Sequence, residues 1–209
     1  MKKILSIILS AFMLITLGAC GSTGENNLSP RQEAETIAPT MPAQTETTTD
    51  GSKNLVVYFS GTGNTKALAE TIAQTAGADI FEIVPAEPYT SADLNYNDNN
   101  CRANLEMNDE NARPAIANSI ENIDEYDTIF IGYPIWWGTM PRIINTFLDT
   151  YDLSGKTIMP FCTSGGSGIG TSVYAIKDAC PNADVKDGMR GVSSTPSAQV
   201  EEWIATNIE

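Results

Sequence analysis

The stretch Ser60-Gly61-Thr62-Gly63-Asn64-Thr65 lies between two segments of different periodicity. Residues 55–59 form an apolar run typical of a buried strand, and residues 66–73 carry a helical pattern. The first N–H groups of a helix lack internal partners, and the helix dipole favours an anion there. Two glycines let the backbone curl inward, and three hydroxyls can donate to phosphate oxygens. The stretch therefore predicts a phosphate-binding loop.

Five strand candidates alternate with helical patterns in the rest of the chain. They span residues 55–59, 79–84, 128–133 and 157–162, with a weaker one near 183–192. Continuous apolar strands separated by helices indicate a parallel sheet covered on both faces. The second candidate alternates more, which favours an edge position. Pro160 lies inside the fourth candidate and lacks an N–H group, so we expect a bulge or a locally unpaired edge there.

Two further loops follow strands at the same predicted edge of the sheet, where ligands bind in such folds. Residues 133–141 contain the adjacent Trp136 and Trp137, whose side chains diverge and could stack on a flat ring. A hydrophobic plug or a partner-binding patch is the alternative for this loop. Residues 163–170 contain four glycines, which favours close backbone approach to a ligand over a flexible linker.

Composition excludes several classes of site. The chain has no histidine, which rules out Ser-His-Asp and Cys-His catalysis and removes the commonest transition-metal ligand. We also expect no obligatory metal and no side-chain nucleophile. The formal net charge of −14 argues against nucleic acid as a partner.

A dinucleotide fingerprint competes with the phosphate-loop interpretation. Gly61 and Gly63 begin such a motif, and Glu82 lies near the spacing of its acidic ribose partner. Lys66 occupies the place of the third glycine, so the motif is incomplete. NAD is therefore not expected as the primary ligand.

The N-terminal region reads as a targeting segment. Residues 1–19 combine two lysines, an apolar stretch and small residues, typical of a signal peptide. The sequence Leu17-Gly18-Ala19-Cys20 resembles the bacterial lipobox, which implies cleavage before Cys20 and its acylation. Residues 20–52 read as a disordered tether, because they contain few large apolar residues. We expect an exported, membrane-anchored protein whose folded domain spans residues 53–209.

Three more cysteines occur at an odd count and without CxxC spacing. The apolar surroundings of Cys162 and Cys180 indicate buried side chains. Cys101 lies in a polar segment, and we expect it to be exposed.

Three motifs in order resemble the flavodoxins: SGTGNT after the first strand, YPIWWG after the third and TSGGSG after the fourth. The resemblance covers essentially all of residues 53–209. It implies an α/β three-layer sandwich with a five-stranded parallel sheet of order 2-1-3-4-5 and non-covalently bound FMN.

On this resemblance the first loop holds the FMN phosphate. The second lies along the isoalloxazine, with Trp136 or Trp137 near its face, and the third meets the pyrimidine edge through backbone groups. The cofactor-binding residues so implied are Ser60, Gly61, Thr62, Gly63, Asn64, Thr65, Pro134, Ile135, Trp136, Trp137, Gly138, Thr163, Ser164, Gly165, Gly166, Ser167 and Gly168.

The chain departs from the best-known flavodoxins in lacking their usual tyrosine soon after the fourth strand. Stacking is therefore expected on one side of the ring, with the other face open to substrate or to another loop. Residues 85–114 are a candidate for that loop, with a short helix near 101–107. Tyr96 is a candidate contact, and a surface tyrosine is an equally good interpretation.

These features predict an FMN-binding electron-transfer protein that exchanges electrons with a redox partner protein or a small-molecule acceptor. One alternative is an FMN-dependent NAD(P)H:quinone-type oxidoreductase. The other is a surface binding lipoprotein that has lost FMN, because FMN is made inside the cell.

Overall fold

The structure is a computed structural model, and it describes residues 52–208. The expected signal segment and nearly all of the tether, including Cys20, lie outside the described residues. Six strands form one parallel sheet: β1 (Asn54–Tyr58), β2 (Asp79–Glu82), β3 (Thr128–Pro134), β4 (Thr157–Thr163), β5 (Asp184–Val185) and β6 (Met189–Gly191). The order is β2-β1-β3-β4-β5, and β6 also pairs with β4. The predicted order and the edge position of the second strand are confirmed.

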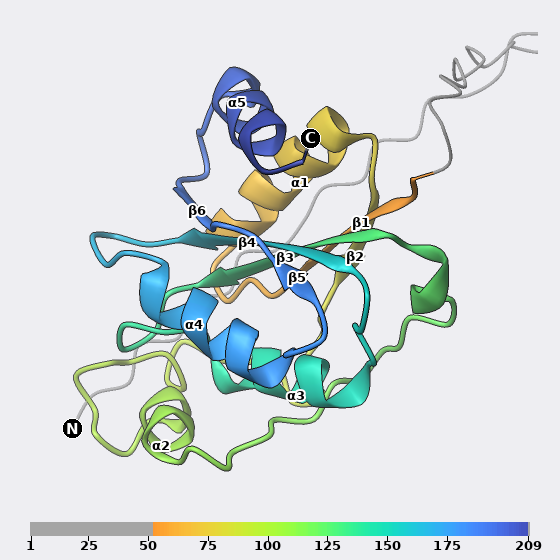
Figure 1. Cartoon of the computed structure of the whole chain (residues 1–209). Helices are drawn as coiled ribbons and strands as arrows, with labels where there is room; N and C mark the ends of the chain where they lie inside the picture. Colours follow the sequence, from red (N-terminus) through yellow and green to blue (C-terminus); the bar gives the residue numbers. More distant parts are fainter. Residues whose placement is uncertain (1–51, 209) are drawn as a thin grey trace, which may run out of the picture. The chain divides into compact units, whose positions relative to one another are not determined.

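Helices cover both faces of the sheet (Figure 1). On one face lie α1 (Asn64–Ala76) and α5 (Ser197–Asn207), and on the other lie α2 (Arg102–Asn108), α3 (Arg142–Thr150) and α4 (Gly170–Ala179). A 3-10 turn, η1 (Ile123–Glu125), precedes β3. The predicted α/β three-layer sandwich is therefore confirmed. No helix among the described residues is both long and apolar enough to cross a membrane.

Side-chain alternation along the strands separates two hydrophobic cores. Phe130 and Phe161 point into the core beneath α1 and α5, whereas Ile129 and Ile158 point into the core beneath α3 and α4. Gly132 lies opposite Phe161 in the β3–β4 register. A Cβ at position 132 would lie 2.1 Å from that ring, so close packing requires glycine here.

The edge beyond β4 contains the bulge that Pro160 predicts. Ile158 is opposite Val185, but Phe161 is opposite Met189, so the edge strand gains one residue between β5 and β6. Pro160 pairs with Ile131 of β3 and has no partner in β5 or β6. The residue that lacks an N–H group therefore lies where the edge strand is interrupted. The extra residue places Val185 in one core and Met189 in the other. The weak fifth strand of the sequence is thus two short strands.

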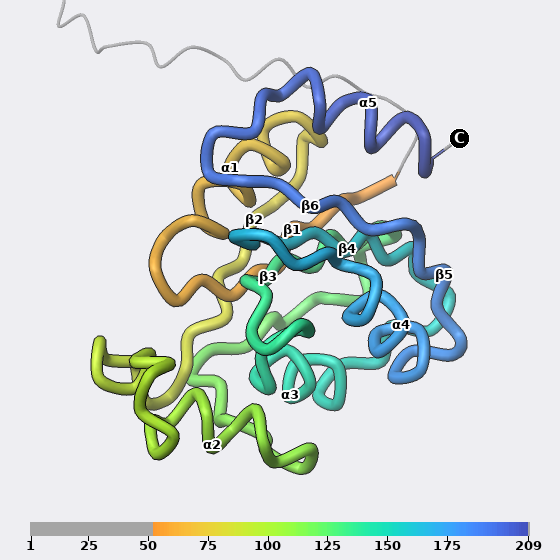
Figure 2. The backbone as a smooth tube through the Cα atoms, turned by 90° about the vertical axis from the view of Figure 1, so that its left-hand side faces the viewer, coloured from red at the N-terminus to blue at the C-terminus, as the bar shows by residue number. Residues whose placement is uncertain are grey.

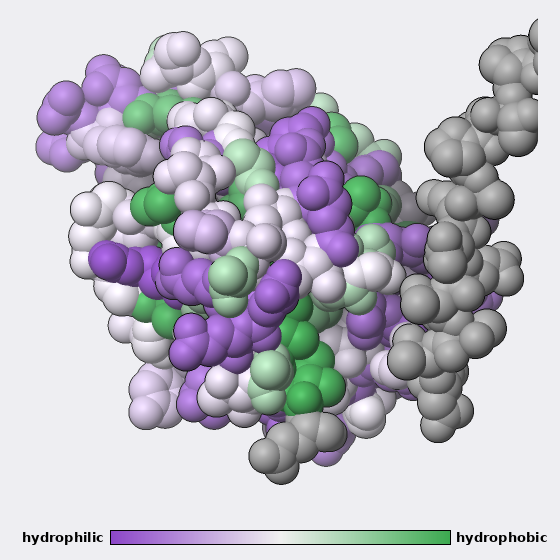
Figure 3. All heavy atoms as spheres, turned by 90° about the horizontal axis from the view of Figure 1, so that it is seen from above, coloured by the Kyte–Doolittle hydropathy of each residue, from purple (hydrophilic) through white to green (hydrophobic). Residues whose placement is uncertain are grey.

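The outer surface above α1 and α5 is a mixture of hydrophilic and hydrophobic residues (Figure 3).

On the opposite side of the sheet, α3 buries one stripe made of Ile143, Ile144, Phe147 and Leu148. Complete burial of each such side chain contributes about 1.5–3 kcal/mol to folding.

The segment before α2 leaves the sheet and returns toward it, and Figure 2 shows α2 on the same side as α3. The short helix expected near residues 101–107 is confirmed. Cys101 is only 4% exposed, so the expectation of an exposed thiol is wrong. Its sulfur accepts the N–H of Asn104 at 3.4 Å and caps α2, which explains a buried cysteine in a polar stretch.

The other two cysteines are buried, as their apolar surroundings indicate. Burial raises the pKa of Cys162 to about 12. This thiol therefore stays protonated at neutral pH and behaves as a small hydrophobic side chain.

Candidate functional site

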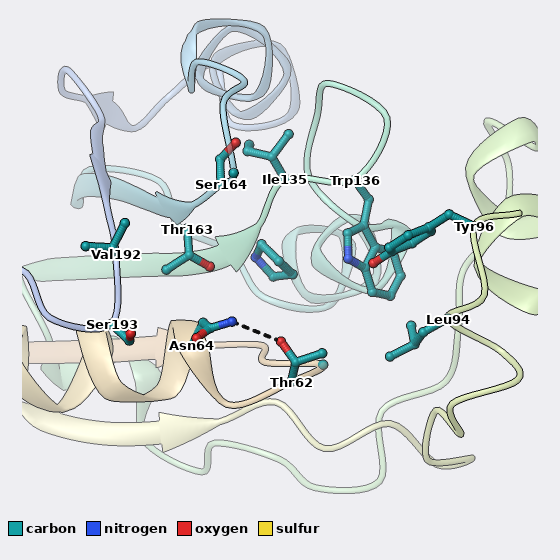
Figure 4. Close-up of a pocket in the computed structure, with 13 residues that line it drawn as sticks. Thr62, Asn64, Leu94, Tyr96, Ile135, Trp136, Thr163, Ser164, Val192 and Ser193 are labelled. Atoms are coloured by element: carbon teal, nitrogen blue, oxygen red, sulfur yellow. Dashed lines mark hydrogen bonds between the residues drawn. The ribbon is translucent and has the colours of Figure 1, made fainter.

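Loops at the carboxyl ends of β1, β3, β4 and β6 enclose a cavity of about 360 Å³ (Figure 4). None of the side chains that line it carries a formal charge at neutral pH. The lining residues are Gly61, Thr62, Asn64, Leu94, Tyr96, Pro134, Ile135, Trp136, Thr163, Ser164, Gly165, Val192 and Ser193. In Figure 4, Leu94 and Tyr96 lie at one end, Val192 and Ser193 lie at the other, and Asn64 and Thr163 lie between them.

The loop before α1 is shaped by a hydroxyl. The Ser60 Oγ accepts the N–H groups of Gly63 at 3.1 Å and Lys66 at 3.3 Å. Gly63 has a φ of 88°, which glycine adopts without strain. Within residues 52–208, no acceptor pairs with the N–H groups of Thr62 or Asn64. The loop therefore presents uncharged backbone and side-chain donors at a helix N-terminus, where they could bind an anion.

A buried hydroxyl pair connects this loop to the end of β4. Thr65 is 1% exposed and Thr163 is 8% exposed, and their Oγ1 atoms lie 2.8 Å apart. Thr163 lines the cavity, whereas Thr65 lies behind it. The pair fixes the first turn of α1 against β4.

The two tryptophans occupy a tight turn at the end of β3. The N–H of Trp136 donates to the carbonyl of Thr139 at 2.9 Å, and the return bond measures 3.0 Å. Trp137 has a φ of 47° and Gly138 a φ of 82°, both in the left-handed region. This pattern matches a type I′ turn, in which asparagine or glycine is usual. A bulky residue there costs about 1–3 kcal/mol.

The turn sends the two indoles to different surroundings, as adjacent side chains diverge. Trp136 is 4% exposed and Trp137 is 46% exposed. Trp136 packs edge-on against Phe59 at 5.6 Å and Tyr89 at 5.3 Å between ring centroids. It therefore belongs to the core and forms part of the cavity wall at the same time.

A charged network holds Tyr89 in this position. Its hydroxyl donates to Glu106, and the Arg102 guanidinium lies 4.2 Å from its ring centroid. The Arg102 Nε in turn donates to Glu106 at 2.6 Å. Burial and the hydrogen bond to Glu106 raise the pKa of Tyr89 above its ordinary value. The phenol is therefore neutral and serves as a donor at physiological pH.

The glycine-rich loop only partly reaches the cavity. Ser164 and Gly165 line it, but Gly166, Ser167 and Gly168 are exposed and lie outside the lining. The carbonyl of Gly166 accepts a bond of 3.0 Å from Arg190 on β6.

Nine of the residues inferred from the flavodoxin resemblance line the cavity. Those outside the lining are Ser60, Gly63, Thr65, Trp137, Gly138, Gly166, Ser167 and Gly168. Lining does not test cofactor contact, so every one of these residues remains a prediction.

Four lining residues were not inferred as cofactor-binding residues from the sequence. Val192 and Ser193 directly follow β6, so the rule that ligands bind at carboxyl ends of strands could have found them. Tyr96 was considered only as one of two interpretations. Leu94 carries no local signal, because the fold of the segment before α2 brings it to the cavity.

Glu82, the candidate ribose partner of the dinucleotide fingerprint, is engaged elsewhere. It accepts a bond of 2.9 Å from the Tyr58 hydroxyl and pairs with Lys66 at 3.4 Å. It does not line the cavity.

Comparisons with known proteins agree with this geometry. A candidate flavoprotein from Bacteroides eggerthii is 48% identical, with a TM-score of 0.72, over 74% of this chain and 97% of that chain. A second, from Bacteroides uniformis, is 41% identical, with a TM-score of 0.70, over 74% and 99%. A Lactobacillus acidophilus flavoprotein crystallised in complex with FMN is 25% identical, with a TM-score of 0.57, over 73% and 98%.

No curated protein matches the chain. The family model described as flavodoxin matches residues 53–207, which is most of the chain and all of the sheet. The chain therefore belongs to the flavodoxin family.

Proposed function

We propose that this protein binds FMN and transfers electrons through it. The observation that carries the proposal is one uncharged cavity that joins a helix N-terminus with available donors to a wall of aromatic side chains. FMN combines a phosphate with a flat apolar ring and so matches both ends. The FMN complex of the Lactobacillus acidophilus relative supports the assignment.

The donors present suit this group. Thr62, Asn64 and the amides around them would hold the phosphate, and Trp136 with Ile135 would lie against the ring. Ser164 and Gly165 would meet the ring edge. The cofactor supplies the redox chemistry when it is bound.

The lining residues favour electron transfer over side-chain catalysis. They include no carboxylate, amine or thiol that could act as acid, base or nucleophile near neutral pH. Tyr96 is the single titratable side chain among them, and burial raises its pKa. We expect the acidic protein and the aromatic wall to disfavour the anionic reduced ring, which lowers the reduction potential. A potential above that of free FMN would contradict this expectation.

The direct test is titration of the purified protein with FMN and with riboflavin, followed by flavin fluorescence and absorbance. We expect saturable binding of FMN and weaker binding of riboflavin, which lacks the phosphate. A colourless protein that binds neither would instead support a surface binding lipoprotein without flavin.

The electron acceptor is either a redox partner protein or a small molecule. A redox titration with two resolved one-electron steps would support the carrier function. Rapid NAD(P)H consumption with a quinone would support an FMN-dependent oxidoreductase. The lining offers the N-terminus of α1 for a phosphate, and FMN would occupy it, which favours the carrier.

We further propose that the protein is exported and anchored to the membrane through acylated Cys20. The lipobox-like sequence over residues 17–20 and the polar stretch after it support this proposal. Metabolic labelling with a radioactive fatty acid tests it, because Cys20→Ala should abolish the label. A label that persists in this variant would refute the anchor.

A further inference from the structure

A fourth loop reaches the cavity, in addition to the three that carry the sequence motifs. It spans residues 192–195 and follows β6, and its members Val192 and Ser193 line the cavity. In Figure 4, Ser193 lies at the end of the cavity next to Asn64, the first residue of α1. The loop contains no charged side chain that would repel an anion.

The bulge in the edge strand sets where this loop begins. With the extra residue, Gly191 of β6 lies opposite Thr163 of β4, which lines the cavity. A Cβ at position 191 would lie 2.8 Å from the Leu68 side chain of α1 and 2.8 Å from the Thr195 hydroxyl. Because only glycine fits this space, the chain passes close to α1 and β4 immediately before the loop.

A buried hydroxyl fixes the conformation of the loop. Thr195 is 7% exposed, and its Oγ1 accepts the N–H of Val192 at 2.8 Å. Its own N–H donates to the Val192 carbonyl at 3.0 Å. Within residues 52–208, no acceptor pairs with the N–H of Ser193. The loop is therefore held in shape by its own bonds, which lowers the entropy lost when Ser193 binds a ligand.

A phosphate is the ligand group that suits this position. Its three terminal oxygens are strong acceptors, and they can take bonds from more donors than residues 60–65 alone supply. Ser193 adds a hydroxyl and an N–H at the same end of the cavity as Asn64. We propose that Ser193 is a phosphate-binding residue, so that the loops before α1 and before α5 hold the phosphate together. This inference rests on the proposed function, which it deepens.

The test compares Ser193→Ala with the wild type in titrations with FMN and with riboflavin, followed by flavin fluorescence. We expect FMN affinity to fall about tenfold, because a hydrogen bond to a charged group is lost, and riboflavin affinity to stay within about twofold. The phosphorus-31 chemical shift of bound FMN should move as well. Ser193→Asp should weaken FMN binding further, because its carboxylate repels the phosphate, and should leave riboflavin binding unchanged.

Ser194→Ala is the matched control, because Ser194 is the neighbouring serine, exposed and outside the cavity lining. It should change neither affinity and should leave the phosphorus-31 shift as it is. Equal losses of FMN and riboflavin affinity in Ser193→Ala would overturn the inference, because they would assign the hydroxyl to the ribityl chain. If the wild type and Ser193→Ala bind FMN equally well, only the inference fails; if the wild type does not bind FMN, the proposed function fails as well.

Discussion

The two ends of the cavity are built in different ways. The end that we propose for the phosphate (the phosphate end) comes from one contiguous loop, residues 60–65, whose shape is set by Ser60, Gly63 and the start of α1. At the end that we propose for the ring (the ring end), Trp136 lines the cavity and packs against Phe59 and Tyr89 from two other segments. One end therefore depends on local backbone geometry, and the other depends on packing between distant side chains.

Because of this difference, substitutions at the two ends should affect ligand affinity and folding stability to different degrees. A change at residues 60–64, which are not buried, should alter binding of the phosphate with little effect on folding, whereas Thr65 is buried and also holds α1 against β4. A change at the ring end should alter folding and ring binding together, because Trp136 lines the cavity and packs against Phe59 and Tyr89 in the core.

The largest expected effect follows Tyr89→Ala. Loss of a ring that contacts Phe59 and Trp136 should lower the free energy of unfolding by about 3 kcal/mol in urea denaturation. FMN and riboflavin affinities should fall by the same factor, since the phosphate end is intact. Tyr174→Ala, at an exposed tyrosine, should change stability by about 0.5 kcal/mol or less. A fall in FMN affinity without a fall in riboflavin affinity would contradict the assignment of Tyr89 to the ring end.

Thr65→Val tests the connection between the phosphate loop and β4. It retains shape but leaves the Thr163 hydroxyl without its buried partner, which should lower unfolding free energy by about 1–3 kcal/mol. Thr71→Val, in the same helix, removes only a bond to the Ala67 carbonyl and serves as the control. Equal destabilisation of the two variants in thermal unfolding would show that the Thr65–Thr163 pair stabilises the fold no more than the bond from Thr71 to the Ala67 carbonyl.

Ser60→Ala should act on the phosphate alone. Without its Oγ, the N–H groups of Gly63 and Lys66 lose their acceptor and the loop relaxes. We expect FMN affinity to fall about fivefold, equivalent to about 1 kcal/mol, with riboflavin affinity nearly unchanged. Ser91→Ala, in an exposed turn, is the control. Parallel losses for both flavins would contradict the assignment of this loop to the phosphate.

The smallest expected effect is on the pH dependence of the unfolding free energy above pH 10. Because burial and Glu106 raise the pKa of Tyr89 above the unfolded value of about 10, its contribution to stability is complete below pH 10 and declines above it. Tyr89→Phe should therefore make the decline of unfolding free energy between pH 10 and 11 shallower. The loop over residues 60–65 contains no titratable side chain, so Ser60→Ala should not change this slope. A steeper slope in Tyr89→Phe would reverse the sign of the linkage.

The sequence predicts local and periodic features well. The strand order followed from a family resemblance, and the bulge at Pro160 followed from its missing N–H group. The buried position of Cys101 did not follow, because capping of α2 depends on where the loop before it folds. For the same reason Leu94 was missed at the cavity, and the pairing of Thr65 with Thr163 requires the fold to bring together residues far apart in the chain.

The bulge at Pro160 also affects how this protein meets its own copies. An unbroken outer strand would present a continuous ladder on which a second chain could add a strand. Here β5 and β6 are two and three residues long and differ by one residue in register. An added strand in register with β5 would be one residue out of register with β6, so its side chains there would point to the opposite face of the sheet. The interrupted edge therefore discourages a second copy of the chain from adding a strand to this sheet.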